Sequence, residues 1–307
     1  MITGERAAAL LWQGIIPLVP FVLLLNVRIW RNACPLGRLS QGPEGAPAGI
    51  GRAAIRTAIL IFAAILPFRA TWFAESGVIT AGFLGAIGVV AVSLGRRSAR
   101  RSGFCTTFCP MLPVELLYGQ APLVEVGRGA CSSCSLCTAR ACPQLSPRAA
   151  IAQHLGRARQ DGTWTLTPMG AFAAAFPGVI VAFSLSSHPS VAASALDLML
   201  GATVSWGAAS AVIAVLRPRW DRAMLSLGWM AIALWAWLTM PGVADVWGWP
   251  QATPLLRAST EMLALVWLLH GLRSERRARA ATRAQQHSRR GTHRDTQPLH
   301  QVEPPLE

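Results

Sequence analysis

Residues 8–26 read AALLWQGIIPLVPFVLLLN, a run without a single charged side chain. A helix of this length rises about 28 Å, close to the ~30 Å hydrocarbon thickness of a bilayer. Six more apolar runs follow, at 54–73, 77–95, 167–186, 192–216, 223–241 and 254–272. The last is the weakest, because it contains Arg257 and Glu261, which can pair across one helical turn. With 52% hydrophobic and 14% charged residues, the chain is predicted to be an all-α polytopic membrane protein with about seven transmembrane helices.

The distribution of arginine predicts the topology. All 28 basic residues are arginine, and 24 of them lie in four segments, 27–53, 96–166, 217–222 and 273–307. The turns at 74–76, 187–191 and 242–253 contain none. Basic loops stay on the cytoplasmic side, so we expect the N-terminus outside and the C-terminus inside. Six spans, the alternative, would place the basic tail outside. The net charge of +14 is therefore attributed to topology and not to nucleic-acid binding.

These runs divide the chain into four regions. Residues 1–95 form a three-helix membrane block with a Cys-Pro loop, and residues 96–166 a small cytoplasmic domain with six of the seven cysteines. Residues 167–272 form a four-helix membrane block, and the basic tail at 273–307 is predicted to be disordered. Asp161-Gly162 predicts the turn of a small hairpin. Three glycines spaced three apart in the third run, at 82, 85 and 88, predict close helix packing.

A compact group of cysteines suggests a cofactor. The spacing C-x2-C-x2-C-x4-C-P is formed by Cys131, Cys134, Cys137 and Cys142, followed by Pro143. Such spacing is typical of the thiolate ligands of a [4Fe–4S] cluster. Zinc sites usually join two C-x2-C pairs across a longer gap, and disulfides between cysteines this close are strained. We predict a ferredoxin-like iron–sulfur domain, with zinc or an empty site as the alternatives.

The remaining cysteines belong to a repeated feature. Cys34-Pro35 follows the first apolar run, and Cys109-Pro110 follows the third, with Cys105 four residues before Cys109. Trp30 occupies the position equivalent to Cys105. The three cysteines could hold a second cluster with a different fourth ligand or an open iron, or they could be structural. Alternatively, Cys109 and Cys142 exchange sites, as in two-cluster ferredoxins.

The Cys-x3-Cys-Pro motif after a membrane helix, followed by the ferredoxin-type cysteine group, resembles the polyferredoxin-type membrane iron–sulfur proteins. These include the NapH-like and NosR-like subunits and the CcoG/FixG-like proteins. The resemblance covers roughly residues 8–145. This chain departs from that pattern in its W-x3-C-P first copy and in having a single cysteine group. The resemblance implies a multi-pass protein of the bacterial inner membrane that moves electrons between a quinol or cytoplasmic donor and a partner redox protein.

Other candidate residues carry weaker signals. Asp197, inside the fifth run, suggests a proton path or a quinol contact, or else pairing near the outer end of the helix. His154 is a loop histidine or a fourth ligand. Arg128, Arg140 and Arg148 set topology or stabilise a negatively charged cluster. No haem is expected, because the sequence has no C-x-x-C-H motif and because His188 and His270 lie about a membrane thickness apart, ~30 Å.

The predicted function is one-electron transfer through thiolate-ligated iron. The sequence shows no acid–base or nucleophile constellation, so whether the chain is itself an enzyme stays undecided, and a partner respiratory subunit is expected. The alternative is an assembly, metal-handling or redox-sensing factor for a respiratory complex. A third hypothesis is a transporter-like body with a regulatory cluster. The expected partners are lipid, a redox protein and, in one variant, a quinone.

Overall fold

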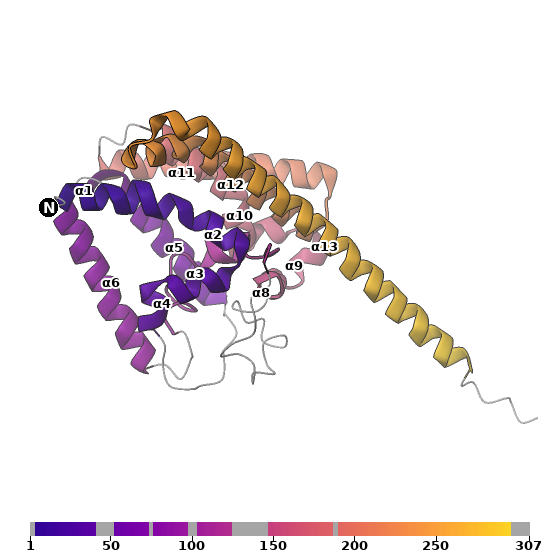
Figure 1. The fold of residues 1–307 in the computed structure, drawn as a ribbon. Coiled ribbons are helices and arrows are strands. Elements are labelled where there is room, and N and C mark those ends of the chain that lie inside the picture. The colour runs from indigo at the N-terminus through magenta and orange to yellow at the C-terminus, as the bar shows by residue number, and fades with distance from the viewer. Residues whose placement is uncertain are drawn as a thin grey trace, which may run out of the picture.

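The computed structural model describes residues 4–40, 52–73, 76–97, 103–124, 147–186 and 190–295. Within these ranges every regular element is helical (Figure 1). Seven of the described helices are long and apolar enough to cross a membrane: Gly4–Leu25, Ala53–Phe73, Gly77–Arg96, Pro168–Leu185, Val191–Leu216, Trp220–Val246 and Pro250–Arg277. Each overlaps one predicted run, so the prediction of a polytopic helical membrane protein is confirmed.

Proline makes the first two spans irregular. The first span consists of α1 (Gly4–Ala9), the π-helical η1 (Leu10–Ile15), the 3-10 helix η2 (Ile16–Leu18) and α2 (Val19–Leu25). Pro17 and Pro20 lack the N–H that a regular helix needs. Proline also explains the irregularity of the second span. Pro67 lies near the end of α5 (Arg52–Phe68), just before the π-helical η3 (Arg69–Phe73). Membrane helices accommodate proline through such local changes of pitch.

The C-terminal block contains the longest helices. They are α10 (Pro168–Leu185), α11 (Val191–Leu216), α12 (Trp220–Val246) and α13 (Thr253–Asp295), with the short 3-10 helix η6 (Pro250–Ala252) before α13. Thr167 and Ser190 cap α10 and α11 by accepting hydrogen bonds from Gly170 N and Ala193 N, both at 3.2 Å. α10 crosses α11 closely, because a Cβ on Gly178 would overlap the carbonyl oxygen of Gly201. α12 packs against both α10 and α13.

The seventh span differs from expectation in two details. Arg257 does not pair with Glu261; its Nε donates to Trp237 O at 2.9 Å, and its guanidinium lies 4.4 Å from the centroid of the Trp237 ring. The basic segment expected to be disordered from Arg273 instead continues α13 as helix to Asp295, beyond the rest of the bundle (Figure 1). Arginine, alanine and glutamine are all good helix formers, which favours this extension. Residues 296–307 lie outside the described ranges.

α6 (Gly77–Arg97) lies at the edge of the molecule and contacts it mainly at its two ends (Figure 1). Gly77 is in close contact with Gly4, and Gly95 with the backbone of Ser40. Among the described residues nothing lies within 4 Å of an added Cβ on the glycines at 82, 85 and 88. The close helix packing predicted for them is therefore not found in the described part of the chain, although the neighbouring Phe83 stacks on Phe73.

The segment between the third and fourth spans joins the main hydrophobic core. It contains α7 (Leu112–Tyr118), α8 (Pro147–Leu155), α9 (Ala158–Asp161) and the 3-10 helix η5 (Trp164–Leu166). All seven residues of α7 are buried, and α7 contacts α2, α5, α8 and α12. Gly162 has φ +75°, so the predicted turn is present, but residues 164–166 form a 3-10 helix and no hairpin.

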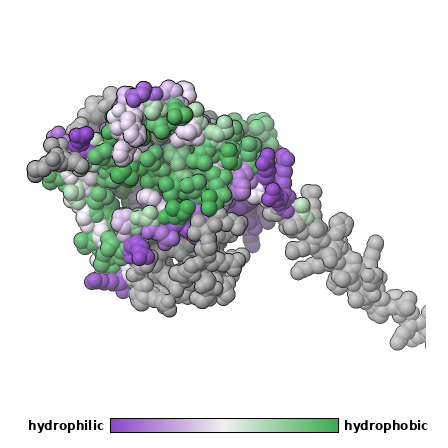
Figure 2. Space-filling model, viewed as in Figure 1, coloured by the Kyte–Doolittle hydropathy of each residue, from purple (hydrophilic) through white to green (hydrophobic). Residues whose placement is uncertain are grey.

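The surface agrees with a lipid environment. Large apolar side chains are exposed on the spans, including Leu60, Val78, Leu196, Val215 and Leu255, each at least 68% exposed. Figure 2 shows hydrophobic residues covering much of the helical body, with hydrophilic residues toward its margins. Exposing such apolar surface to water would cost free energy, whereas contact with the hydrocarbon of a bilayer does not.

Candidate functional site

Both Cys-Pro pairs lie directly before short helices at the ends of spans. Cys34 joins α3 (Val27–Ala33) to α4 (Pro35–Leu39), with extended backbone angles of φ −68° and ψ 120°. Proline disfavours a helical conformation in the residue before it, which explains the break between the two helices. Cys109 lies between the turns at 103–108 and those at 110–111, which lead into α7. The two copies therefore share a short helix after the Cys-Pro pair, but only Cys34 directly follows a helix.

The structure brings Cys34, Cys105 and Cys109 into one neighbourhood. Cys105 is buried, and its Sγ lies 3.5 Å from the hydroxyl of Ser40, just after α4. Cys34 and Cys109 are half-buried, and each interacts electrostatically with the Cys105 thiol. Nevertheless, among the described residues no three Cys, His, Asp or Glu side chains are grouped closely enough to hold a single metal ion.

A buried ion pair accompanies these cysteines. Arg31, on α3, donates from Nε and Nη2 to Glu115 Oε2, on α7, at 2.9 and 2.6 Å. Their side chains are only 7% and 3% exposed. The Trp30 side chain also donates a hydrogen bond to Glu115. Burial raises the pKa of Glu115 above its ordinary value, while the two donors of Arg31 that converge on one oxygen favour its carboxylate form. The pair ties the end of the first span to α7.

One donor of this pair has no partner. Arg31 Nη1 is buried and makes no hydrogen bond within the described part of the chain. Burial alone would lower the pKa of Arg31, but Glu115 and the neighbouring Cys105 sulfur raise it above its ordinary value. A buried guanidinium N–H without a partner costs free energy, so such groups normally meet an acceptor. The site thus offers one charge-assisted donor to an anionic group near the thiols.

Burial and the charge of Arg31 shift the pKa values of the Cys105 and Cys109 thiols in opposite directions. Burial raises the pKa of the Cys105 thiol above its ordinary value, and Glu115 and Cys34 act in the same sense. Burial likewise raises the pKa of Cys109, further than that of Cys105. Arg31 lowers both pKa values, so it stabilises the thiolate forms. Thiolates are the forms that bind metals, so Arg31 favours ligation at both cysteines.

The segment that carries the four-cysteine motif is anchored next to this site at both ends. Leu123 N and Val124 N donate to Leu24 O and Leu25 O, at 3.1 and 3.0 Å, at the C-terminal end of α2. Asn26 Nδ2 donates to Val124 O at 2.8 Å. After the motif, the chain re-enters the described structure at Pro147, the first residue of α8. Pro147 and Val27 both pack against Gly119, where an added Cβ would lie 3.1 and 3.4 Å from their side chains. The described residues on either side of 125–146, Val124 and Pro147, therefore both lie beside the start of α3.

A second ion-pair network holds α8 in place. Arg148 Nη2 contacts Asp221 Oδ2 at 3.1 Å and Glu275 Oε1 at 3.2 Å, and Arg219 contacts Asp221 at 3.3 Å. Both carboxylates are buried, that of Asp221 at the start of α12 and that of Glu275 within α13. Together with Arg31–Glu115, these contacts join all four arginine-rich segments at one end of the bundle. This arrangement agrees with the prediction that the four arginine-rich segments lie on one side of the membrane.

The remaining predicted site residues have mixed outcomes. Cys131, Cys134, Cys137 and Cys142 lie outside the described residues, as do Arg128, Arg140 and His188. His154 is buried at the end of α8, so the expectation of a solvated loop histidine is wrong: α8 packs against α7 and α10. Asp197 is half-buried within α11, and His270 is exposed.

Sequence reasoning missed the residues that organise this end of the bundle. Arg31 and Glu115 are 84 positions apart, and nothing in the spacing of either residue indicates the other. One signal was available. Glu115 is the only acid in the short apolar stretch LPVELLY, and an acid that is buried among apolar side chains needs a partner. For Arg148 the sequence predicts a charge that sets topology or stabilises a cluster, but not its ion pairs, because its partners lie in two later helices.

The fold and this site define a class, a polytopic helical membrane protein whose arginine-rich end gathers cysteines around a buried ion pair. Comparison with protein-family models, with curated proteins and with solved structures finds no match. The particular activity therefore depends on the chemistry of the residues themselves.

Proposed function

We propose that the protein is a membrane-bound iron–sulfur electron-transfer protein, with the main [4Fe–4S] cluster on Cys131, Cys134, Cys137 and Cys142. It would pass electrons between a cytoplasmic or quinol donor and a partner redox protein. The observation that supports the proposal is that Val124 and Pro147, which flank residues 125–146, both lie beside the start of α3. The four-cysteine motif would then lie within reach of three more cysteines and a buried cation with an unused donor.

The donor chemistry fits an anionic, sulfur-rich group. Cys34, Cys105 and Cys109 supply three thiols for a second cluster, and Arg31 supplies a positive charge and the free Nη1–H. Hydrogen bonds and positive charge near the sulfurs of a cluster raise its reduction potential. When bound, such a cluster supplies one-electron transfer at a potential that its surroundings set.

The protein's own residues have positioning roles in this proposal. The Arg31–Glu115 pair fixes α3 against α7, and thereby Cys34 against the turn that contains Cys105 and Cys109. Arg148 holds α8, and with it the end of the cysteine-bearing segment. The positive-inside rule supports a cytoplasmic position for this end of the bundle and an inner-membrane location. Because ~30 Å of hydrocarbon separates it from the other side, transfer across the membrane needs a partner subunit.

Electron paramagnetic resonance of the anaerobically reduced protein tests the proposal. We expect the signal of a [4Fe–4S]⁺ cluster, abolished in Cys134→Ser and retained in Ser133→Ala, which alters the neighbouring residue without removing a thiol. A second cluster predicts about eight irons per chain, halved in Cys34→Ser. No signal in any redox state, with iron absent, would refute the proposal.

Redox cycling separates this function from the alternative of an assembly, metal-handling or sensing factor. An electron carrier should be reduced and reoxidised repeatedly by a quinol analogue or a soluble ferredoxin without losing iron. An assembly or metal-handling factor would instead release iron or the intact cluster to an apo-acceptor. Release during the first cycles would favour the alternative.

A further inference from the structure

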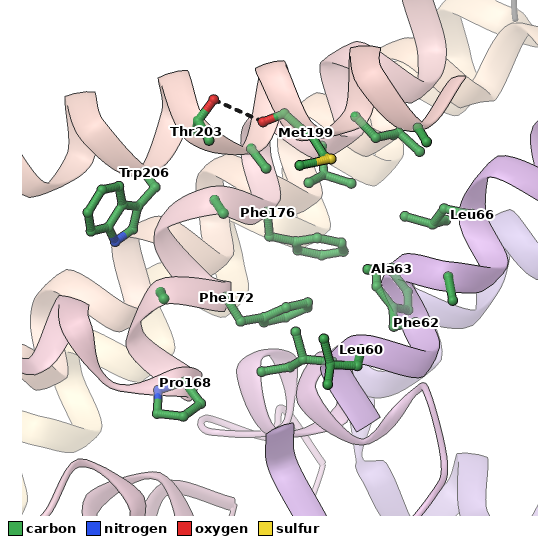
Figure 3. A pocket seen from close by; sticks show the side chains of 18 of the residues that line it. Leu60, Phe62, Ala63, Leu66, Pro168, Phe172, Phe176, Met199, Thr203 and Trp206 are labelled. Atoms are coloured by element: carbon green, nitrogen blue, oxygen red, sulfur yellow. Dashed lines mark hydrogen bonds between the residues drawn. The ribbon is translucent and has the colours of Figure 1, made fainter. Parts of the chain in front are cut away.

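A long apolar groove runs along the membrane-spanning part of the bundle, between α5, α10 and α11. Its volume is about 750 Å³, within the range of ligand sites. Figure 3 shows side chains from all three helices pointing into it, among them Phe62, Phe172 and Met199. The ring of Phe62 packs edge-on against Phe172 and Phe176, each with centroids 5.8 Å apart, and these rings form part of the wall. The groove is therefore a shaped surface between helices.

Among the described lining residues, one is charged, and it lies at one end of the groove. Arg56, on the first turns of α5, is exposed and lines the groove together with Pro168, the first residue of α10, and Trp206. Trp206 Nε1 donates to Thr165 O at 3.1 Å, just before α10, which fixes Trp206 at the same end. The arginine pattern assigns this end to the cytoplasmic side. A basic side chain in that position attracts anionic lipid headgroups.

The other polar groups of the groove are already used. The hydroxyl of Thr203 donates within its own helix to Met199 O and Leu200 O, both at 2.9 Å, and the indole N–H of Trp206 is bonded to Thr165 O. A quinone ring would need hydrogen-bond donors for its carbonyl oxygens along the groove. An acyl chain needs none, and only its headgroup requires a cation.

The length of the groove fits one lipid leaflet. Its α5 lining extends from Arg56 to Pro67, about 16 Å along a helix axis. Half of a ~30 Å hydrocarbon core is about 15 Å. A lipid with its headgroup at Arg56 would thus lay one chain along Leu60, Ala63 and the phenylalanine rings.

We infer that this groove is a binding site for an anionic phospholipid of the cytoplasmic leaflet, with its phosphate on Arg56 and one acyl chain between α5, α10 and α11. The site is independent of the cysteines, and the inference does not rest on the proposed electron-transfer function. It explains how an apolar groove of this size is filled between three membrane-spanning helices.

Native mass spectrometry of the detergent-purified full chain tests the inference, with phosphatidylglycerol, phosphatidylcholine or a long-tailed ubiquinone added as the probe. We expect one phosphatidylglycerol per chain, bound more tightly than phosphatidylcholine. Arg56→Gln should weaken phosphatidylglycerol about fivefold, or ~1 kcal/mol, and remove the preference over phosphatidylcholine. Arg96 is an exposed arginine near the C-terminal end of α6, on the same predicted membrane side as Arg56. Arg96→Gln should change neither the affinity for phosphatidylglycerol nor the preference over phosphatidylcholine.

A second pair of variants tests the groove without changing charge. Ala202 lines the groove, so Ala202→Phe should fill it and abolish stoichiometric binding. Ala208, exposed on the same helix and outside the lining, is the matched control, and Ala208→Phe should bind normally. Equal binding by all four variants would overturn the inference, as would displacement of phosphatidylglycerol by equimolar ubiquinone.

Discussion

Breaking the Arg31–Glu115 pair should have unequal consequences for its two members. Both side chains are more than nine-tenths buried, and two hydrogen bonds join them. Removing one partner of such a pair costs about 3–5 kcal/mol, because the other charge stays buried alone. Arg31 cannot shed its proton in Glu115→Met, so the full cost applies at every pH. In Arg31→Met, however, Glu115 can become neutral by binding a proton.

The pH dependence follows from the pKa of Glu115. Burial raises this pKa above its ordinary value, while Arg31 and the Trp30 hydrogen bond lower it. Without Arg31, burial is opposed only by Trp30, so the folded-state pKa of Glu115, already above its ordinary value, rises further above the unfolded-state pKa. The folded state then binds more protons, and stability falls as pH rises from about 4.5 through the folded pKa. Arg31→Met should therefore be mildly destabilised at pH 5 and strongly at pH 8.

Unfolding in mixed micelles of increasing SDS content, followed by tryptophan fluorescence, measures these effects. We expect Glu115→Met to lose about 3–5 kcal/mol at both pH values. Arg31→Met should lose about 1–3 kcal/mol at pH 5 and more at pH 8. The double variant should approach wild type, because an apolar pair of similar volume removes both buried charges. Small, additive and pH-independent losses would refute the view that the pair is isolated from solvent.

Three further predictions use the same unfolding assay or a chemical probe. Arg148→Met should lose about 2 kcal/mol, because it removes a shared cation from two buried carboxylates, whereas Arg157→Met, at an exposed site, should lose nothing measurable. Gly178→Leu should lose at least ~2 kcal/mol by separating α10 from α11, and Gly207→Leu, which faces open space, should not; equal losses would contradict the helix crossing. Because the pKa of Cys109 is raised, its alkylation in metal-free protein should accelerate about tenfold per pH unit from pH 7 to 9, and a flat profile by peptide mass spectrometry would contradict that environment.

The spans could be predicted from sequence because hydrocarbon imposes a length and a composition on each helix. The seven runs and their arginine-rich connections required no knowledge of partners. Local proline effects, such as the π-helical η1 and η3, were less accessible, because a proline indicates a disturbance but not its form. The glycines at 82, 85 and 88 show the converse limit. Small residues permit close packing, but only the tertiary fold decides whether another helix packs against them.

The candidate site could be predicted only in part. The ligand types came directly from the cysteine spacings, because metal coordination imposes local geometry. Arg31, Glu115 and Arg148 were beyond sequence reasoning, since their pairing depends on how α3, α7 and α8 meet in space. α7 itself is too short to span a membrane, and only its burial among α2, α5, α8, α10 and α12 explains why the stretch LPVELLY is apolar.

Chemical analysis of anaerobically purified protein tests the central claim most directly. We predict about four irons and about four acid-labile sulfides per chain for each complete cluster, with both lost from the main site in Cys134→Ser and retained in Ser133→Ala. Stoichiometric zinc with no acid-labile sulfide in the unmodified protein would contradict the iron–sulfur account.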